Sequence, residues 1–399
     1  MTVSIPAAAR PFSGGALTAL LSPATRLLAL GEPTHGVDAF LDLRNELFRH
    51  LVEHEGYRSV AIESDCLAAL VADAYVAEGT GSLDEAMERG FSPGFGASAA
   101  NRALLSWMRS YNRDRPASER LRFYGIDGPL EMTGAASPRQ SLTALHDHLS
   151  AHVELPLPLS SGALDELLGP DARWTDPAAL MDASRSVGRT PEARELRLVA
   201  DDLTALLTSQ APRLAAVASP DARWLAGLHA RTATGLLRYH DALADTSPTR
   251  LEGVMALRDA IMADHLDAIV RRESPRGPTL AFAHNRHLQR ERSEIRFAGR
   301  PLRWWSAGAI MATRLEEGYA FAAATFGTRG ADVPPPDTLE GLLSALPHAR
   351  AVVDPALLAA ALDERPAPRT PADHTYFSLD PATTDRTDAI VFVKDLPTP

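Results

Sequence analysis

The chain has 399 residues, 45% of them hydrophobic and 23% charged, so it can bury a large core and is neither disordered nor fibrous. Its formal net charge of −11 argues against nucleic acid as a partner, because phosphate contacts need a basic surface. Lys394 is the only lysine and Cys66 the only cysteine, which excludes an internal Schiff-base or phosphate-binding lysine, an intrachain disulfide and cysteine-ligated metal centres.

The chain begins without the features of an exported protein. Residues 1–12 lack a positively charged start followed by an apolar run, so they do not match a secretory signal. The longest apolar stretch, residues 17–30, is interrupted by Pro23 and Arg26. It is shorter than the roughly 18 uninterrupted apolar residues of a membrane-spanning helix. We therefore expect a cytoplasmic protein that has no membrane partner.

Six short, mostly aliphatic runs predict buried β-strands in the first and last thirds of the chain. Helical segments separate the runs, and their hydrophobicity is continuous rather than alternating, which favours a parallel sheet built from βα units. We expect an α/β fold in which helices flank a mostly parallel central sheet. The expected strands are residues 26–30, 59–62, 121–126, 279–283, 319–325 and 389–393.

The middle of the chain has a different composition. Residues 138–273 are rich in Ala, Leu, Arg and Asp and have almost no β-branched clusters. Segments 192–207 and 224–243 carry apolar residues at three- and four-residue spacing, which indicates amphipathic helices. We therefore expect an α/β catalytic core of residues 1–135 and 274–399, and a helical insertion or lid of residues 136–273.

A carboxylate and an imidazole follow the first expected strand. Glu32 and His35 lie three residues apart in the turn that leads into the next helix. Ligands of open α/β sheets bind at the carboxyl ends of the strands, where such a loop exposes polar side chains. Glu32 and His35 are therefore a candidate acid–base pair, although this spacing alone is weak support.

The helix after this turn directs an arginine toward the core. Phe40, Leu43, Leu47 and Leu51 form an apolar stripe at about 100° per residue, and Arg44 falls on the flank of that stripe. A guanidinium in this position needs carboxylate partners to offset its desolvation. Two nearby strand ends, at residues 32 and 63, supply them. Arg44 is either a buried structural ion pair or a group that also orients a reacting atom.

Further polar residues close two other strands. Glu63 ends the second expected strand, and His284 and His287 leave the strand at residues 279–283 together. In one parallel sheet His35, Glu63 and His284 emerge along the same edge. Histidine has the pKa best suited to proton transfer near neutrality, and a carboxylate beside it can hold its tautomer. Several polar strand ends together predict an active site.

These residues make the sequence resemble the erythromycin esterase family over most of its length. Several separated blocks occur in the family's order, which is more telling than any single block, whereas the helical middle matches only in length and helical character. The blocks are Ala29-Leu30-Gly31-Glu32, Thr34-His35-Gly36, Arg44, Glu63, Trp107-Met108-Arg109-Ser110-Tyr111-Asn112, Tyr124-Gly125-Ile126-Asp127, Arg258-Asp259, Met262-Ala263 and Ala283-His284-Asn285-Arg286-His287.

The resemblance implies an α/β core with a helical part that closes over a deep cleft, and hydrolysis of an ester or lactone without a metal or other cofactor. By this likeness His35 is the general base that activates water, and Glu32 lies beside it. The other members of the polar floor orient the base and stabilise charge on the carbonyl oxygen. They are Arg44, Glu63, His284 and His287.

The substrate expected from the resemblance is a small molecule of the macrolide or polyketide kind. Asp127 and Arg258 lie in the family blocks, and we expect them to contact substrate. Trp304 and Trp305 stand where related sequences are less aromatic, so they either line a differently shaped pocket or belong to the core. The preference for arginine over lysine is typical of a GC-rich, actinomycete-like genome. For a member of this family from such a source, we expect a role either in antibiotic resistance or in the biosynthesis of a self-made natural product.

Other nucleophiles are poorly placed. Ser92 is the centre of Gly90-Phe91-Ser92-Pro93-Gly94, but a nucleophile elbow needs a strand before it and a helix after it. Here the preceding segment reads as helix and the following glycines indicate a loop. Cys66 is expected to be a small core residue.

A metal-dependent hydrolase remains an alternative. His50-Leu51-Val52-Glu53-His54 matches a metalloprotease pattern, but His54 is expected within the apolar stripe of its helix. A zinc ion held by His35, His284 and His287 is a second form of this alternative.

Two further alternatives keep the same site. A non-catalytic binding protein has little use for buried charges, which are costly to desolvate. The same base and oxyanion site could instead run acyl transfer, cyclisation or another proton transfer in natural-product biosynthesis, if water is excluded. The sequence does not distinguish water from an alcohol as the acceptor.

Overall fold

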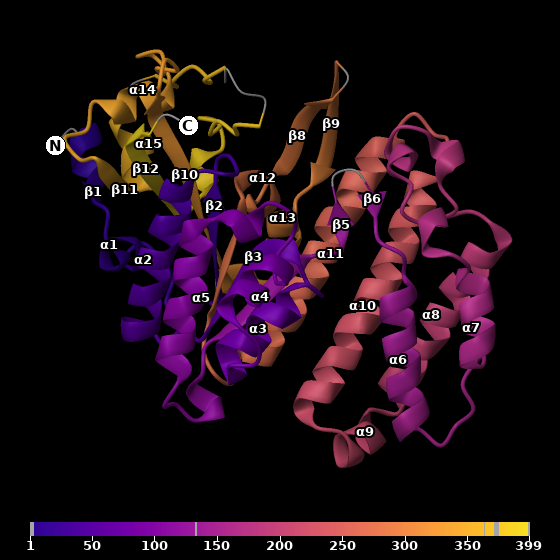
Figure 1. Cartoon of the computed structure of the whole chain (residues 1–399). Coiled ribbons are helices and arrows are strands. Elements are labelled where there is room, and N and C mark those ends of the chain that lie inside the picture. Colours follow the sequence, from indigo (N-terminus) through magenta and orange to yellow (C-terminus); the bar gives the residue numbers. More distant parts are fainter. Residues whose placement is uncertain (1–3, 132–133, 298, 363, 371–374, 398–399) are drawn as a thin grey trace. The chain divides into compact units, whose positions relative to one another are not determined.

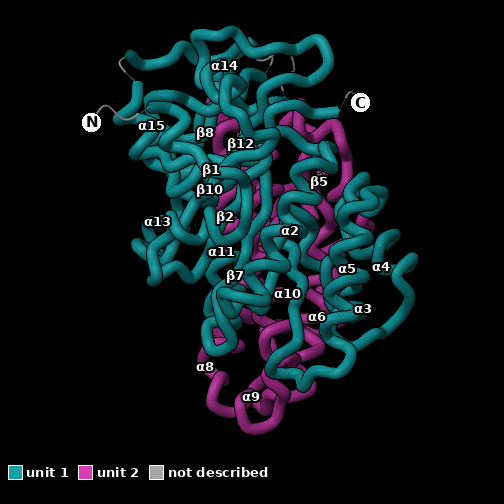
Figure 2. The backbone as a smooth tube through the Cα atoms, turned by 90° about the vertical axis from the view of Figure 1, so that its left-hand side faces the viewer, with its two compact units in different colours: residues 1–126, 266–399 teal, residues 127–265 magenta. Residues whose placement is uncertain are grey.

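A computed structural model describes residues 4–131, 134–297, 299–362, 364–370 and 375–397 of the chain. Strands and helices alternate in its first and last parts, whereas the middle is mainly helical (Figure 1). The chain divides into two compact units (Figure 2): unit 1 comprises residues 1–126 and 266–399, and unit 2 comprises residues 127–265. The domain boundaries expected from the sequence stay a prediction.

The centre of unit 1 is an eight-stranded mixed sheet. In order across the sheet, its strands are β1 (Ala9–Pro11), β11 (Arg350–Val353), β12 (Ala389–Leu396), β10 (Tyr319–Arg329), β2 (Leu27–Glu32), β7 (Thr279–His284), β3 (Ser59–Asp65) and β4 (Arg122–Asp127). Neighbouring strands from β12 to β3 run parallel. β11 pairs antiparallel with β12, and β1 pairs antiparallel with β11.

All six strands expected from the sequence occur, and the predicted α/β fold with a mostly parallel sheet is confirmed. Every residue of β2 and β7 is buried, as expected of strands covered on both faces. The strands β1 and β11 were not predicted, because three and four residues are too few for a clear hydrophobic pattern. Two small hairpins were also missed: β5 (Leu130–Glu131) with β6 (Gly134–Ala135), and β8 (Arg292–Phe297) with β9 (Arg300–Trp305).

The longest helix within unit 1, α2, has the predicted amphipathic pattern. Its apolar stripe is buried, and α2 packs beside α5. His54 was wrongly expected within this stripe: it is exposed, because α2 ends at this residue, past the core. The helices of unit 1 are α1 (Gly14–Thr18), α2 (Asp38–His54), α3 (Ala69–Glu78), α4 (Leu83–Arg89), α5 (Ala99–Asn112), α12 (Asn285–Leu288), α13 (Ala307–Leu315), α14 (Leu339–Ser344) and α15 (Pro355–Ala361).

Unit 2 has its own core of leucine, alanine and valine side chains around the buried Trp174. Its helices are α6 (Arg139–His152), α7 (Ser161–Leu168), α8 (Pro191–Ser209), α9 (Ala211–Val217), α10 (Pro220–Leu243) and the first part of α11 (Arg250–Glu273). Short 3₁₀ turns are η1 (Ile5–Ala8), η2 (Phe95–Ala97), η3 (Ala117–Glu119), η4 (Asp171–Arg173), η5 (Pro177–Leu180), η6 (Ala183–Arg185), η7 (Glu316–Gly318) and η8 (Thr384–Arg386).

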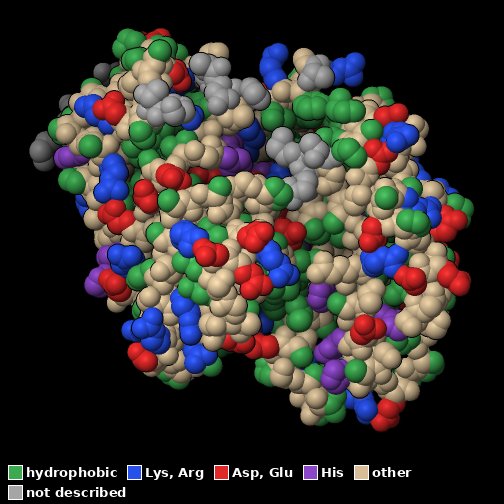
Figure 3. Space-filling view, in the orientation of Figure 1, with side chains coloured by type: hydrophobic (Ala, Val, Ile, Leu, Met, Phe, Trp, Pro, Cys, Tyr) green, Lys and Arg blue, Asp and Glu red, His purple; other side chains and the backbone are tan. Residues whose placement is uncertain are grey.

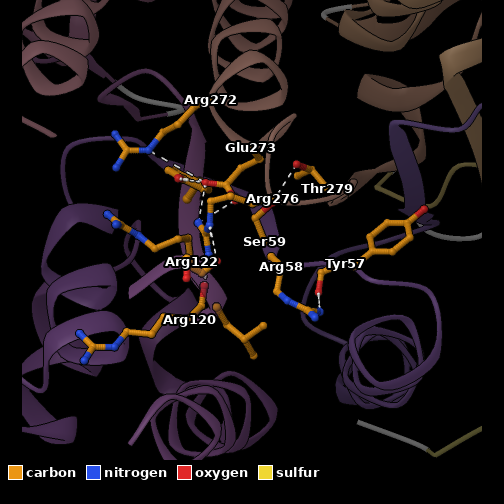
Figure 4. A network of polar contacts seen from close by, with 12 residues as sticks. Tyr57, Arg58, Ser59, Arg120, Arg122, Arg272, Glu273, Arg276 and Thr279 are labelled. Atoms are coloured by element: carbon orange, nitrogen blue, oxygen red, sulfur yellow. Dashed lines mark hydrogen bonds and ion pairs between the residues drawn. The ribbon is translucent and has the colours of Figure 1, made fainter. Parts of the chain in front are cut away.

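A buried polar network joins the amino-terminal parts of β3, β7 and the edge strand β4 (Figure 4). Glu273 is fully buried, accepts a hydrogen bond from the Tyr124 hydroxyl at 2.6 Å and pairs with Arg276 at 2.8 Å. Burial raises the pKa of the Glu273 carboxyl, and the nearby guanidinium opposes this. Ser59 and Thr279, the first residues of β3 and β7, bond to each other at 2.8 Å. This network lies at the edge of the sheet opposite the strand ends that carry the candidate site.

Charged side chains of both signs are interspersed over the face shown in Figure 3. Among the described residues, no helix is long and apolar enough to cross a membrane. The absence of a nucleic-acid partner stays a prediction from the charge.

Candidate active site

The adjacent strands β2, β7 and β3 bring the predicted polar residues of unit 1 to one edge of the sheet. Glu32 and His284 are register partners at the ends of β2 and β7, and Glu63 lies near the end of β3. A Cβ on Gly31 would lie 2.1 Å from Oδ1 of Asn285. Only glycine leaves room there for Asn285, whose amide reaches past β2 to donate to the Ala324 carbonyl of β10 at 2.8 Å. This close approach fixes the turn that carries the two histidines.

Glu32 and His35 form the pair expected from their spacing. Oε1 of Glu32 lies 2.6 Å from Nδ1 of His35. Glu32 is buried, whereas the His35 side chain is 42% exposed, so the imidazole connects a buried carboxylate to accessible space. Burial is the main reason that the pKa of Glu32 is raised, and the contact with His35 opposes this effect. Gly36 has a φ of 74°, which permits the turn between His35 and α2.

Glu63 contacts all three histidines. Its Oε1 lies 3.7 Å from Nε2 of His35 and 3.4 Å from Nε2 of His287. Its Oε2 accepts a hydrogen bond from the backbone nitrogen of His284 at 2.8 Å. The carboxylate therefore fixes the turn after β7 and places negative charge beside two imidazoles.

His284 is held in one tautomer by its surroundings. The backbone nitrogen of Arg286 donates to Nδ1 at 3.1 Å, so the ring proton lies on Nε2 and is donated to the Thr375 carbonyl at 3.2 Å. Burial, followed by the charges of His35 and Arg286, holds the pKa of His284 well below its usual value. Both ring nitrogens are thus engaged in a neutral imidazole, which suits an orienting role better than proton transfer.

Arg44 faces inward, as the helix geometry predicted, with 1% of its surface exposed. The expectation that Arg44 pairs directly with a carboxylate was wrong, because the described residues place no carboxylate oxygen within 4 Å of its guanidinium. Instead, Nε and Nη2 of Arg44 donate to Oδ1 of Asn45 at 3.1 and 2.8 Å. Phe282 lies under the guanidinium at 4.9 Å. Burial lowers the pKa of Arg44 to about 10, so the side chain stays charged at neutral pH.

These side chains surround a cavity of about 270 Å³ in unit 1. Its polar lining includes Glu32, His35, Arg44 and Glu63. Apolar and small residues complete the wall, among them Leu41, Ile62, Pro93, Gly94, Phe95, Phe282 and Ala283. The cavity combines a carboxylate–imidazole pair with a buried cation, and its size suits the reacting group of a small-molecule ester.

Two of the four expected substrate-contacting residues belong to unit 2 and two belong to unit 1. Asp127 and Arg258 pair with each other in unit 2, with 2.7 Å between Oδ2 and Nη2. In unit 1, Trp304 is buried in β9, and Trp305 is 51% exposed with the Arg292 guanidinium 4.8 Å from its ring. Neither tryptophan lines the 270 Å³ cavity. Their contact with substrate stays a prediction.

Ser92 and Cys66 have structural surroundings. Ser92 follows helix α4, and its Oγ accepts a hydrogen bond from the backbone nitrogen of Asp65 at 2.9 Å. The strand-to-helix turn of a nucleophile elbow is therefore missing at Ser92. Cys66 is buried, as expected.

The described side chains include no group of three or more His, Cys, Asp or Glu residues arranged to hold a metal ion. The rings of His35 and His284 lie 5.1 Å apart, and those of His284 and His287 lie 6.4 Å apart. His284 already uses both nitrogens for hydrogen bonds. In the metalloprotease-like segment, the rings of His50 and His54 lie 4.6 Å apart, and His50 faces Glu55 at 3.8 Å.

Sequence reasoning missed several residues around the cavity. Asn101 lines it and is fully buried, and its amide donates to the Phe95 carbonyl at 2.9 Å. It could have been found, because it lies on the same helical face as the buried Leu105 and Met108 of α5. Thr375 bonds to the His284 imidazole from a loop 91 residues later in the chain, and no sequence motif marks it.

Comparisons with known proteins agree with this fold. Three solved structures match at TM-scores of 0.73, 0.70 and 0.68: a Bacillus cereus protein, a succinoglycan biosynthesis protein, and a mutant of the erythromycin esterase EreC in its open conformation. In the same order, their sequences are 16%, 18% and 23% identical to this chain. The matches cover 98%, 99% and 95% of this chain, and 96%, 96% and 92% of the respective solved chains.

A sequence relative and a family profile add to this likeness. Erythromycin esterase type II of Escherichia coli is 25% identical over 274 residues, which are 67% of this chain and 61% of that protein. The profile of the erythromycin esterase family matches residues 52–396. This match spans most of the chain, which therefore belongs to the erythromycin esterase family.

Proposed function

We propose that this chain is a carboxylic ester hydrolase in which His35 activates water for attack on an ester or lactone carbonyl. The contact between Glu32 and His35 at 2.6 Å, at the wall of a cavity that also holds Arg44, carries this proposal. A cavity with a carboxylate-supported imidazole and a buried cation has the parts needed for general-base attack and for stabilising the resulting oxyanion.

Glu32 sets the tautomer of the base. When its carboxylate accepts the proton of His35 Nδ1, the lone pair of Nε2 is available to take a proton from water. As that proton transfers, the imidazole becomes positive and the nearby carboxylate charge stabilises it. Glu63, 3.7 Å from Nε2, adds negative charge on the other side of the ring.

Arg44 supplies the positive charge in the cavity. Its guanidinium is fixed by Asn45 and Phe282 and lines the same cavity as His35. When water adds to the carbonyl, the oxygen becomes negative, and a charged donor held in place beforehand stabilises it without reorganising. The collapse of this tetrahedral intermediate then releases a carboxylate and an alcohol.

The other two histidines support the floor of the site. His284 is held neutral between Arg286 and Thr375, and its backbone nitrogen holds Glu63. His287 contacts the same Glu63 carboxylate at 3.4 Å. In this role they orient Glu63 and through it His35.

The proposed substrate is a macrolide- or polyketide-like ester or lactone, by analogy with the Escherichia coli relative named erythromycin esterase type II. Acyl transfer or cyclisation would use the same groups with a substrate hydroxyl in place of water.

Mass spectrometry of the purified protein with a panel of macrolides, other lactones and simple esters tests the proposal. Hydrolysis adds the mass of one water to the substrate. An isomer of unchanged mass would indicate cyclisation or rearrangement, and a product joined to a second alcohol would indicate acyl transfer. The same incubation with a chelator tests the metal-dependent alternative: activity lost on chelation and restored by zinc would contradict direct activation of water by His35.

A further inference from the structure

The partner of Arg44 is unusual for a buried guanidinium. Such a cation normally pairs with a carboxylate, because removing its charge from water is costly. Here two of its nitrogens donate to the neutral amide oxygen of Asn45, at 3.1 and 2.8 Å. Asn45 is anchored in turn, because its Nδ2 donates to the Ala100 carbonyl of α5 at 2.8 Å.

The carboxylates near Arg44 act on it without direct contact. The charges of Glu32, Asp42 and Asp38 favour its protonated form, in that order. None of them bonds to the guanidinium within the described residues, and nothing described accepts a hydrogen bond from its Nη1. The side chain is thus fixed along one edge and still has donors for a ligand in the cavity it lines.

We propose that Asn45 is a positioning residue that holds the Arg44 guanidinium with a neutral acceptor and thereby keeps its positive charge for the carbonyl oxygen of the substrate. This inference rests on the proposed hydrolase function. An aspartate at this position would offer the same oxygen in the same place, and it would also neutralise the guanidinium. Amide and carboxylate are close in shape, so apart from the lost donor to the Ala100 carbonyl the two side chains differ in charge.

Two variants separate this role from a structural one. Asn45→Asp keeps an acceptor for Arg44, whereas Asn45→Ala removes it and leaves the charge; both lose the donor to Ala100. Removal of one oxyanion-stabilising donor typically lowers kcat by about 10²–10³-fold. We therefore expect Asn45→Asp to lower kcat by about 30-fold or more with KM within about threefold, and Asn45→Ala to lower kcat by about tenfold or less.

The order of the two variants decides the question. A purely structural role predicts the reverse order, because the aspartate retains the contacts to Arg44 that the alanine loses. In an Arg44→Gln background, Asn45→Asp should cause no further loss of kcat, since the charge it neutralises is gone. The proposal would be overturned if the Asn45→Asp enzyme had the same kcat as the Asn45→Ala enzyme. It would also be overturned if Asn45→Asp lowered kcat by the same factor in the wild-type and the Arg44→Gln backgrounds.

Thermal unfolding provides a readout that does not depend on turnover. Asn45→Asp should have a higher Tm than Asn45→Ala at pH 7, because its carboxylate pairs with Arg44, and Arg44→Gln should abolish that difference. A wild-type protein that hydrolyses no ester would refute the proposed function, and this comparison would still show whether Arg44 carries an unneutralised charge. A Tm difference that persists without Arg44 would contradict the inference.

Discussion

The substitution Glu32→Gln removes the charge beside His35 while nearly preserving the shape of the side chain. Oε1 of Glu32 lies 2.6 Å from the His35 ring. With about 4 Å between charge centres and an effective dielectric constant of about 20, the carboxylate attracts an imidazolium by about 4 kcal/mol. If half of the positive charge on the imidazole has formed in the transition state, Glu32→Gln removes about 2 kcal/mol of transition-state stabilisation. This corresponds to a decrease in kcat of about 30-fold. A glutamine that donates to Nδ1 would move the ring proton to Nε2 and increase the loss.

The assay is the initial rate of hydrolysis, from pH 4 to 8, of an ester that the wild type cleaves. Burial raises the pKa of Glu32 above its ordinary value of 4.5. Activity should therefore fall on the acid side, as Glu32 takes up a proton at a pH above 4.5, and Glu32→Gln should lose this part of the profile. The matched control is Glu46→Gln in helix α2, because Glu46 is exposed and pairs with Arg350. The rate of this variant should equal that of the wild type.

Stability separates this effect from misfolding. Because the folded-state pKa of Glu32 lies above its ordinary value, its ionisation lowers the free energy of unfolding as the pH rises through that folded-state pKa. Glutamine has no such ionisation, so the variant should be no less stable than the wild type at pH 7. A Glu32→Gln enzyme with kcat within threefold of wild type, or with an unchanged acid limb, would refute the role assigned to the pair.

Two further predictions concern other parts of the chain. Ser92→Ala should keep kcat within threefold of wild type and lower the free energy of unfolding by about 1 kcal/mol, because it removes only the acceptor for the backbone nitrogen of Asp65. If the folded variant were inactive, Ser92 would become a candidate nucleophile. Unit 2 should lose stability as the pH falls from 6.5 to 4, because burial lowers the pKa of His240 to about 4 and that of His265 to about 3. In this pH range the unfolded chain binds more protons than the folded chain. At pH 5 this lowers the free energy of unfolding by about 2 kcal/mol per imidazole. Hydrogen exchange of α10 and α11 measures this. His265→Leu should remove only the share of this imidazole, because burial also lowers the pKa of His148 and His229 in unit 2.

The sequence predicted much of unit 1 because its strands are long, aliphatic and buried on both faces. In a parallel sheet such strands end at a common edge, so Glu32, Glu63 and His284 could be placed together from their positions alone. The inward direction of Arg44 followed from the 3.6-residue period of α2. Both predictions rest on periodicity and on the geometry of regular elements.

What could not be predicted depends on contacts between distant segments. Helix periodicity shows that Arg44 faces the core, but the choice of Asn45 over a carboxylate depends on how the side chain turns within the packed site. The tautomer of His284 depends on the Thr375 carbonyl, which comes from a loop with no regular pattern. His54 was misplaced because periodicity does not say where a helix ends relative to the core beneath it.

The most direct test of the central claim is hydrolysis in ¹⁸O-labelled water by the wild type and by His35→Ala. If His35 activates water, the wild type should place one ¹⁸O atom in the carboxylate product. The folded His35→Ala variant should then lose about 10²–10⁴-fold in kcat, the usual contribution of a general base, and added imidazole should restore part of the rate. A His35→Ala enzyme that hydrolyses the ester at the wild-type rate would contradict the account.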